Sequence, residues 1–223
     1  MKLEEIVPWG RSFEEYRSMF ALSEGDLGRR ILGAGDGPAS FNAELSARGG
    51  SVLSADPLYR FSKEDIAGRI AAASHLVLDQ VRACEADFVW KQIPDLKTLE
   101  TLRMGAMERF LADYEAGRAA GRYRDAALPC LPFDARRFDL ALCSHLLFLY
   151  SDQLDTTAHL RALRELCRVA DEVRIYPLVT LAGKPSPHLE PVMETLAKEG
   201  RNLRLQEVDY EFQRGATRML VIG

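Results

Sequence analysis

The sequence predicts an α/β domain with a mostly parallel seven-stranded sheet, helices on both faces and an antiparallel last strand. Short apolar runs alternate with helical patterns along most of the 223 residues, which is typical of a parallel sheet. A glycine-rich turn follows the first of these runs, between a predicted strand and a predicted helix. Two β-patterned runs then close the chain across a short turn and predict a hairpin, which reverses the last strand.

The first elements follow directly from local patterns. A capping box at residues 12–15 begins a short helix, and residues 30–32 form the first strand. A helix is predicted from about residue 38 to the glycines at 49–50, because glycine readily takes the left-handed conformation that ends a helix. Residues 51–55 form the second strand.

Residues 62–120 predict a helical insertion, or cap, between the second and third strands. Ordinary connections between a strand and a helix are only a few residues long, so this stretch is too long for one. Ser62 and Asp65 cap its first helix, and Pro94 interrupts the helical pattern. Its second helix frays into the glycines that follow it. We expect residues 1–223 to form a single domain.

The alternation of strands and helices resumes after the insertion. Ser186 is the expected N-cap of the last helix, with proline at its first position. The remaining predicted elements are a strand at 138–143, a helix at 154–170, a strand at 173–179 and the hairpin strands at 203–212 and 216–222.

Composition excludes several classes of partner. The net charge is −4, so no overall positive field attracts nucleic acid. No apolar run reaches membrane-spanning length, and the opening residues lack the apolar core of a signal peptide. The four cysteines are widely spaced and never at zinc-ligand spacing, so we expect buried, reduced thiols in a cytoplasmic protein without a metal site. Nothing in the sequence specifies the oligomeric state.

The glycine-rich turn carries the chemistry. Gly33, Gly35 and Gly37 permit positive φ angles and close approach of a ligand, and the following helix offers free N–H groups. Asp56 ends the second strand, 23 residues after Gly33, where a carboxylate can accept hydrogen bonds from ribose hydroxyls. This combination predicts a site for an adenosine-containing ligand.

Position 38 helps to decide which adenosine-containing ligand the turn binds. The dinucleotide fingerprint G-x-G-x-x-G has glycine or alanine at its sixth place. Here that place is Pro38, and the third glycine falls one residue early. The pattern therefore disfavours a pyrophosphate cofactor such as NAD.

Three segments resemble the class I S-adenosylmethionine-dependent methyltransferases. ILGAGDGPASFNAEL resembles the first motif of that family, SVLSADP its ribose-binding strand and LPFDARRFDLALCSHLLF its fourth-strand region. The resemblance covers roughly residues 28–61 and 122–223, and the rest looks like an uncharacterised bacterial branch of the family. It implies a Rossmann-like fold, S-adenosylmethionine as cofactor, and methyl transfer to a small-molecule acceptor that it does not identify.

The resemblance also implies roles for individual residues. The glycine loop passes the methionine and ribose, the residues after Asp56 pack against adenine, and Asp125 bonds its amino group. The residues it assigns to cofactor binding are Gly33, Ala34, Gly35, Asp36, Gly37, Asp56, Pro57, Leu58, Asp125, Ala126 and Ser144. Two positions depart from the family pattern. Ile31 replaces an acidic residue, and Ala127 occupies the usual slot of the acid, so that Asp125 needs a two-residue bulge.

Two further residues are candidate cofactor ligands from the segment before the first strand. In this architecture such a segment often folds over the cofactor, and Arg11, with Tyr16 near it, is placed to meet the methionine carboxylate. The same segment would then bind the methionine amino group in place of the acid that Ile31 replaces. The alternative is that Arg11 and Tyr16 belong to a surface helix.

Histidines and aromatic residues leave several interpretations open. His145, just after the fourth strand, is either a catalytic general base or a structural residue at a strand end. His75 lies in the inserted helix, and His159 and His188 are expected to face solvent. Two aromatic residues, Phe88 and Trp90, either line a substrate pocket or pack between the inserted helices.

Three functions remain open from the sequence. The leading one is an active small-molecule methyltransferase, in which the protein mainly aligns the reactants and excludes water. The second is a non-catalytic S-adenosylmethionine-binding protein, consistent with the missing acid at Ile31. The third is a nicotinamide-dependent oxidoreductase, which Pro38 and the closing hairpin disfavour.

Overall fold

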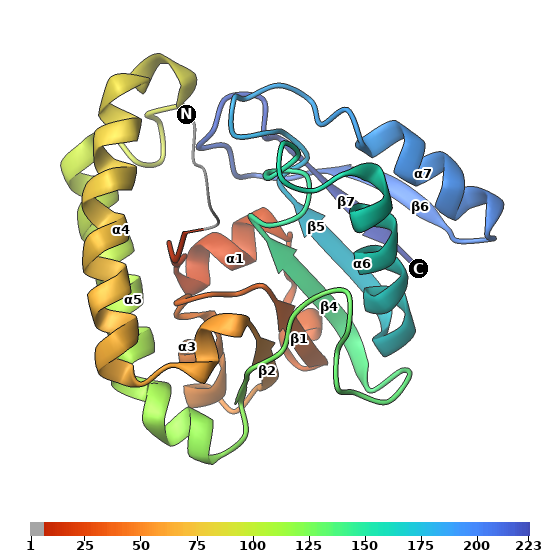
Figure 1. The fold of residues 1–223 in the computed structure, drawn as a ribbon, viewed down its shortest axis with the longest axis horizontal. Coiled ribbons are helices and arrows are strands. Elements are labelled where there is room, and N and C mark those ends of the chain that lie inside the picture. Colours follow the sequence, from red (N-terminus) through yellow and green to blue (C-terminus); the bar gives the residue numbers. More distant parts are fainter. Residues whose placement is uncertain (1–6) are drawn as a thin grey trace.

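A seven-stranded sheet forms the centre of the computed structural model, which describes residues 7–223 (Figure 1). The strand order is β3-β2-β1-β4-β5-β7-β6, and β7 runs antiparallel to both of its neighbours. The predicted fold class is therefore confirmed. The strands are β1 (Arg30–Ala34), β2 (Ser51–Ala55), β3 (Tyr123–Arg124), β4 (Phe138–Ser144), β5 (Ala170–Tyr176), β6 (Leu203–Glu207) and β7 (Arg218–Ile222).

Helices cover both faces of this sheet. The short helices α1 (Phe13–Met19), α2 (Glu24–Leu27) and α3 (Phe41–Ala47) pack on one face, and α6 (Thr156–Val169) and α7 (Leu189–Lys198) on the other. Side chains alternate along each strand, so Ile31 packs with the first group of helices and Leu32 with the second. This alternation gives the central strands β1, β4 and β5 two buried faces, as a central parallel sheet requires.

The insertion between β2 and β3 consists mainly of α4 (Lys63–Ala83) and α5 (Leu96–Ala119), preceded by a 3-10 turn, η1 (Pro57–Arg60). Another such turn, η2 (Glu85–Asp87), follows α4. The two long helices form one side of the molecule, next to the edge that carries β2 (Figure 1). At its far end, Phe88 stacks on Phe212 of the β6–β7 connection, with ring centroids 4.8 Å apart. The insertion therefore spans the sheet from the β3 edge to that connection.

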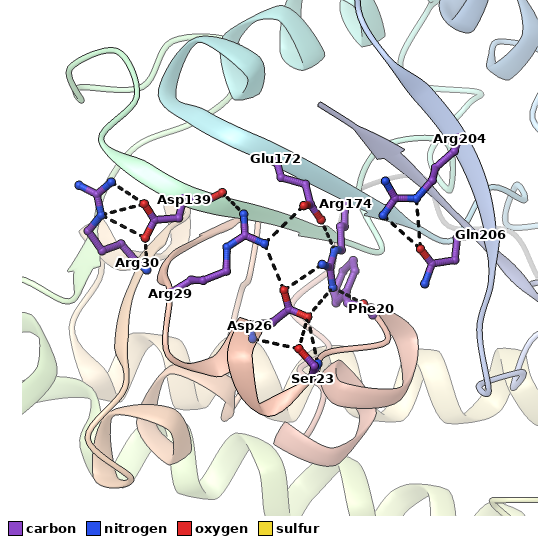
Figure 2. A network of polar contacts seen from close by, with 10 residues as sticks. All are labelled: Phe20, Ser23, Asp26, Arg29, Arg30, Asp139, Glu172, Arg174, Arg204 and Gln206. Carbon is purple, nitrogen blue, oxygen red and sulfur yellow. Dashed lines mark hydrogen bonds and ion pairs between the residues drawn. The ribbon is translucent and has the colours of Figure 1, made fainter.

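Ion pairs occupy the amino-terminal edge of the parallel strands (Figure 2). Asp26 lies 3.0 Å from Arg174 and 3.1 Å from Arg29, and Glu172 lies 2.6 Å from Arg174. Arg30, the first residue of β1, pairs with Asp139, the second residue of β4. Cations and carboxylates match closely here, so this edge serves to join α2 to the sheet.

The closing hairpin differs from its prediction because the insertion contacts its connection. The strands stop at Glu207 and begin again at Arg218 rather than continuing to 212 and from 216. Between them, the carbonyl of Phe212 accepts a hydrogen bond from the N–H of Val89 at 2.7 Å. The backbone groups that would extend the β-ladder are thus used for tertiary contacts.

Three helix boundaries also differ from the predictions. Helix α3 begins at Phe41, after Ser40, because residues 35–39 form the ligand-facing turn rather than a first helical turn. Helix α7 begins at Leu189 with His188 as N-cap, and the Ser186 hydroxyl accepts the His188 N–H at 3.2 Å in the preceding turn. Helix α5 does not fray. It continues to Ala119, and Gly121, with φ of 76°, ends it.

The cysteines are less uniform than expected. Cys143 and Cys167 are buried, but Cys130 is exposed and Cys84 half-buried, because both lie outside the sheet. Within residues 7–223 no three His, Cys, Asp or Glu side chains are grouped as metal ligands. None of the helices described there has both the length and the apolar character that crossing a bilayer demands.

Candidate functional site

A cavity of about 770 Å³ lies at the carboxyl ends of β1, β2 and β4. Ala34, Ala55 and Ser144, the last residues of these strands, line it. Helix α4 closes one side and the start of α6 another. Ligands of open α/β sheets bind where the strand order reverses, and β1 and β4 form that point here.

The glycine loop forms one wall of the cavity, and a side chain is disfavoured at each of its glycines for a different reason. A Cβ at Gly33 would lie 1.7 Å from the carboxylate of Asp36. Gly35 has φ of 70°, and its Cβ would lie 2.5 Å from the side chain of Leu146. Gly37 has φ of 53°, and its Cβ would meet no atom within 4 Å, because this position borders the open cavity. The loop therefore presents bare backbone to a ligand.

Asp36 supports the loop from beneath. Its carboxylate accepts hydrogen bonds from the Tyr16 hydroxyl at 2.8 Å and the Ser54 hydroxyl at 2.6 Å. Burial raises the pKa of Asp36 to about 6, and burial beside this carboxylate raises the pKa of Tyr16 well above its usual range. Asp36 and Tyr16, both predicted cofactor-binding residues, thus lie at the cavity, and both carboxylate oxygens of Asp36 already accept hydrogen bonds.

Asp56 is held rigidly at the end of β2. One oxygen accepts the N–H of Gly37 at 2.9 Å and the other accepts the N–H of Leu58 at 2.8 Å. Burial raises the pKa of Asp56. Each carboxylate oxygen has two lone-pair directions, so one on each remains for vicinal hydroxyls. Pro57 and Leu58 line the cavity beside it.

Arg11 brings a buried cation to the cavity. Its side chain lines the hollow, and its Nε is buried without a hydrogen-bond acceptor. Burial and the nearby charge of Arg103 lower the pKa of Arg11 to about 10, so the guanidinium is charged at neutral pH. The segment before β1 therefore does reach the cavity, as one of the two sequence interpretations holds.

A buried network that the sequence did not reveal lies behind Arg11. Arg103 of α5 forms an ion pair with Glu15 of α1, and Tyr210 donates its hydroxyl to the same carboxylate at 2.7 Å. These pairings lower the pKa of Glu15 to about 2 against the effect of burial. Glu15 pairs directly with Arg103 and acts on Arg11 only through its charge, and the Nε of Arg103 also lacks an acceptor. The network joins distant segments, so it leaves no local sequence pattern.

Ser144 and His145 form the floor of the cavity. The Ser144 hydroxyl lies 2.8 Å from Nδ1 of His145, whose backbone has φ of 53°. Burial and the charges of Arg11 and Arg103 lower the pKa of His145 well below its usual range. The imidazole is therefore neutral at pH 7. In the tautomer with the proton on Nδ1, Nε2 is the nitrogen with a free lone pair.

Asp125 lies apart from the other predicted ligand-binding residues. It is exposed, pairs with Arg60 at 3.3 Å and does not line the cavity, whereas Ala126 and Ala127 do. Phe88 and Trp90 pack with Phe212 instead of lining the cavity.

The prediction that His159 and His188 face solvent is wrong. His159 is fully buried, and its Nε2 accepts the N–H of Phe148 at 2.9 Å. His188 is half-buried, and its ring lies 5.0 Å from that of His159. Both rings support the loop that follows β4, a role visible only once that loop is folded. His75 is exposed on α4.

Two walls of the cavity were also missed by sequence reasoning. Arg69 and Leu76 line it from α4, seven residues apart, and Arg161 lines it from α6. A spacing of seven places two side chains on one helix face, distinct here from the buried stripe of Ile66 and Ile70. The spacing of Arg69 and Leu76 was thus the sequence signal that could have identified this wall of the cavity.

Comparison with known sequences gives one informative relative. No family model matches the chain. An uncharacterized protein of the archaeon Methanocaldococcus jannaschii is 29% identical over 223 residues, which is 100% of this chain and 98% of that protein. An archaeal relative does not support the expected bacterial branch.

Solved structures show similarity at the level of fold. WbdD, crystallised with a kinase inhibitor, aligns with a TM-score of 0.50 at 14% identity, over 95% of this chain and 40% of its own. The magnesium protoporphyrin IX methyltransferase of Synechocystis with bound S-adenosylhomocysteine gives a TM-score of 0.46 at 15% identity, over 89% and 76%. The mitomycin 7-O-methyltransferase MmcR gives 0.49 at 13% identity, over 94% of this chain and 53% of its own. This chain thus spans about half or less of two of these proteins.

Proposed function

We propose that this chain binds S-adenosylmethionine and transfers its methyl group to a small molecule. One observation carries the proposal: bare glycine backbone, a rigid carboxylate and a guanidinium whose buried Nε has no acceptor line a single cavity. The three groups match a ligand that combines a nucleoside with an α-amino acid.

The residues suit that ligand by chemistry as well as position. Asp56 has acceptor directions free for the two ribose hydroxyls, and the space beside Gly37 admits the ribose. Arg11 has a donor without an acceptor, which a carboxylate would satisfy. Pro57 and Leu58 offer apolar surface for an adenine ring.

The protein's part in the reaction would be alignment. The bound cofactor supplies an already activated methyl group. The glycine loop and Asp56 hold one reactant in a fixed position, and Leu146 with α4 shields the site from water. Nε2 of His145 would accept the proton of an acceptor hydroxyl or amine, but burial and the two nearby guanidiniums lower its pKa and make that imidazole a weak base.

The alternatives differ in ligand or in turnover. Enzymes that bind a nicotinamide dinucleotide usually have an all-parallel sheet with the strand order 3-2-1-4-5-6. Here β7 lies antiparallel between β5 and β6. A non-catalytic binding protein would hold the cofactor through the same residues. It is distinguished from an active methyltransferase by turnover: only the enzyme produces S-adenosylhomocysteine when an acceptor is present.

Thermal unfolding with S-adenosylhomocysteine tests the proposal, with NAD as the comparison ligand. Ligand at about 100 times its Kd adds roughly 2.7 kcal/mol, which raises Tm by about 5–10 °C for a chain of this size. Asp56→Asn should remove most of that rise, and the control Asp65→Asn, a carboxylate on the first turn of α4, should keep it.

Two outcomes would contradict the proposal. One is no rise in Tm at millimolar S-adenosylhomocysteine, and the other is a rise with NAD instead.

A further inference from the structure

The cavity extends well beyond the groups that suit the cofactor. Its remaining half lies between α4, the loop after β4 and the start of α6. Leu76 lines this half and, at 49%, is the most exposed large apolar side chain among residues 7–223. Leu149 and Leu154 also face it, and Ala72 and Ala158 leave room beside them. These surfaces are those of a pocket for an apolar molecule.

Two arginines line the same half from opposite walls. Arg69 projects from α4 and Arg161 from α6, and both are exposed. The guanidinium of Arg69 lies 3.8 Å from the ring centroid of Phe61, which orients it. Neither arginine forms a hydrogen bond or ion pair with any residue among 7–223.

The charge around these arginines is unbalanced. Among the described residues that line the cavity, the carboxylates are Asp36 and Asp56, and both belong to the cofactor half. Other arginines of the same helices are paired: Arg82 with Asp79 at 2.7 Å and Arg164 with Glu199 at 2.5 Å. Among the arginines of α4 and α6, the two without an ion pair are thus the two that line the cavity.

We propose that the methyl acceptor has an apolar or aromatic body and an anionic group, which Arg69 and Arg161 bind at the entrance. Carboxylate, sulfonate and phosphate share the required chemistry, since a planar guanidinium donates two parallel hydrogen bonds to each. The apolar body lies against Leu76 and Leu154, with its reactive atom toward Ser144 and His145. This inference rests on the proposed function, because only a methyltransferase has a methyl acceptor.

A matched pair of dyes tests the proposal without knowledge of the natural acceptor. 8-Anilinonaphthalene-1-sulfonate carries an anionic group, and N-phenyl-1-naphthylamine has the same aromatic body without it. Binding of each dye is measured by fluorescence to the full chain, with and without saturating S-adenosylhomocysteine. The test variant is Arg69→Gln with Arg161→Gln, and the control is Arg82→Gln with Arg164→Gln on the same two helices.

The expected result is selective. The test variant should bind the sulfonate about tenfold or more weakly, because neither charge-assisted hydrogen bond can form. It should bind the neutral dye as the wild type does, and the control variant should bind both dyes normally. Equal weakening of both dyes, no weakening of the sulfonate, or no sulfonate binding by the wild type would overturn the proposal.

The same samples test the anionic acceptor and the proposed methyltransferase function separately. S-adenosylhomocysteine should raise the Tm of wild type and test variant equally, since neither arginine lies in the cofactor half. A normal rise in Tm with unselective dye binding refutes only the anionic acceptor. Selective dye binding without that rise refutes the methyltransferase proposal and keeps an anion-selective pocket.

Discussion

Arg11 carries a charge and a buried Nε without a hydrogen-bond acceptor, although its Nη1 donates to the carbonyl of Trp9. Its neighbours within the protein are Arg103, which repels it, and Glu15, which Arg103 and Tyr210 already engage. An unsatisfied buried donor costs roughly 1–3 kcal/mol, more when the group is charged. A ligand carboxylate would recover that cost, so this residue should contribute strongly to binding.

We therefore expect Arg11→Gln to weaken S-adenosylhomocysteine about tenfold or more and to leave 5′-methylthioadenosine unaffected. The second ligand has the same nucleoside and sulfur but no carboxylate. Titration calorimetry with both ligands gives the comparison, with Arg17→Gln, a half-buried arginine on α1, as control. Equal losses for the two ligands would show that Arg11 supports the fold of the site instead of binding a carboxylate.

Helix α5 connects the insertion to the sheet domain through a buried ion pair. Arg103 is 1% exposed and holds Glu15 of α1, while the apolar side of α5 packs on α4. Because α4 forms a wall of the cavity, this pair helps to fix the cavity's width. Glu15 also accepts the backbone N–H of Ser12 at 2.9 Å, which ties the pair to the segment that carries Arg11.

Replacement of Arg103 by leucine should destabilise the protein by about 3–5 kcal/mol, because Glu15 would remain as a buried, unpaired carboxylate. For a chain of this length the loss corresponds to a fall in Tm of about 10 °C. Arg109→Leu on the same helix breaks an exposed pair with Glu44 and should cost less than about 1 kcal/mol.

A double variant provides the check on this mechanism. Arg103→Leu combined with Glu15→Gln should be more stable than Arg103→Leu alone, since no buried charge is left. If the double variant is the less stable of the two, loss of packing rather than loss of charge pairing explains the effect.

At the scale of the whole molecule, two buried imidazoles make stability depend on pH. Burial lowers the pKa of both His145 and His159 in the folded state. Below about pH 6.5 the unfolded chain takes up protons that the folded chain does not, so acidification favours unfolding. Their contribution to stability is therefore complete above that pH and is lost progressively as the pH falls.

His159→Gln should reduce this dependence. The two histidines should lower the free energy of unfolding of the wild type between pH 7 and pH 5, each by at most about 1.4 kcal/mol per pH unit. Asp36, whose folded-state pKa is raised to about 6, opposes this fall equally in the wild type and in the histidine variants. The variant should show a smaller slope, and His75→Gln, at an exposed position on α4, should keep the wild-type slope. Urea unfolding at both pH values measures this, and an unchanged slope in His159→Gln would refute the assignment.

Apart from α2 and β3, which are four and two residues long, local patterns alone determined the order of strands and helices, the glycine loop and Asp56. Each of these depends on neighbours a few residues away: glycine for positive φ, a carboxylate at the end of a strand, apolar side chains at helical spacing. The capping box before α1 and the insertion between β2 and β3 belong to the same class.

Only the tertiary structure decided what surrounds the ligand cavity. The pairing of Arg103 with Glu15 joins residues 88 positions apart, and the free state of Arg69 and Arg161 depends on which carboxylates fold near them. The burial of His159 and the shortened hairpin likewise follow from packing against distant loops. Such interactions are fixed by packing and charge balance in three dimensions, which no local spacing records.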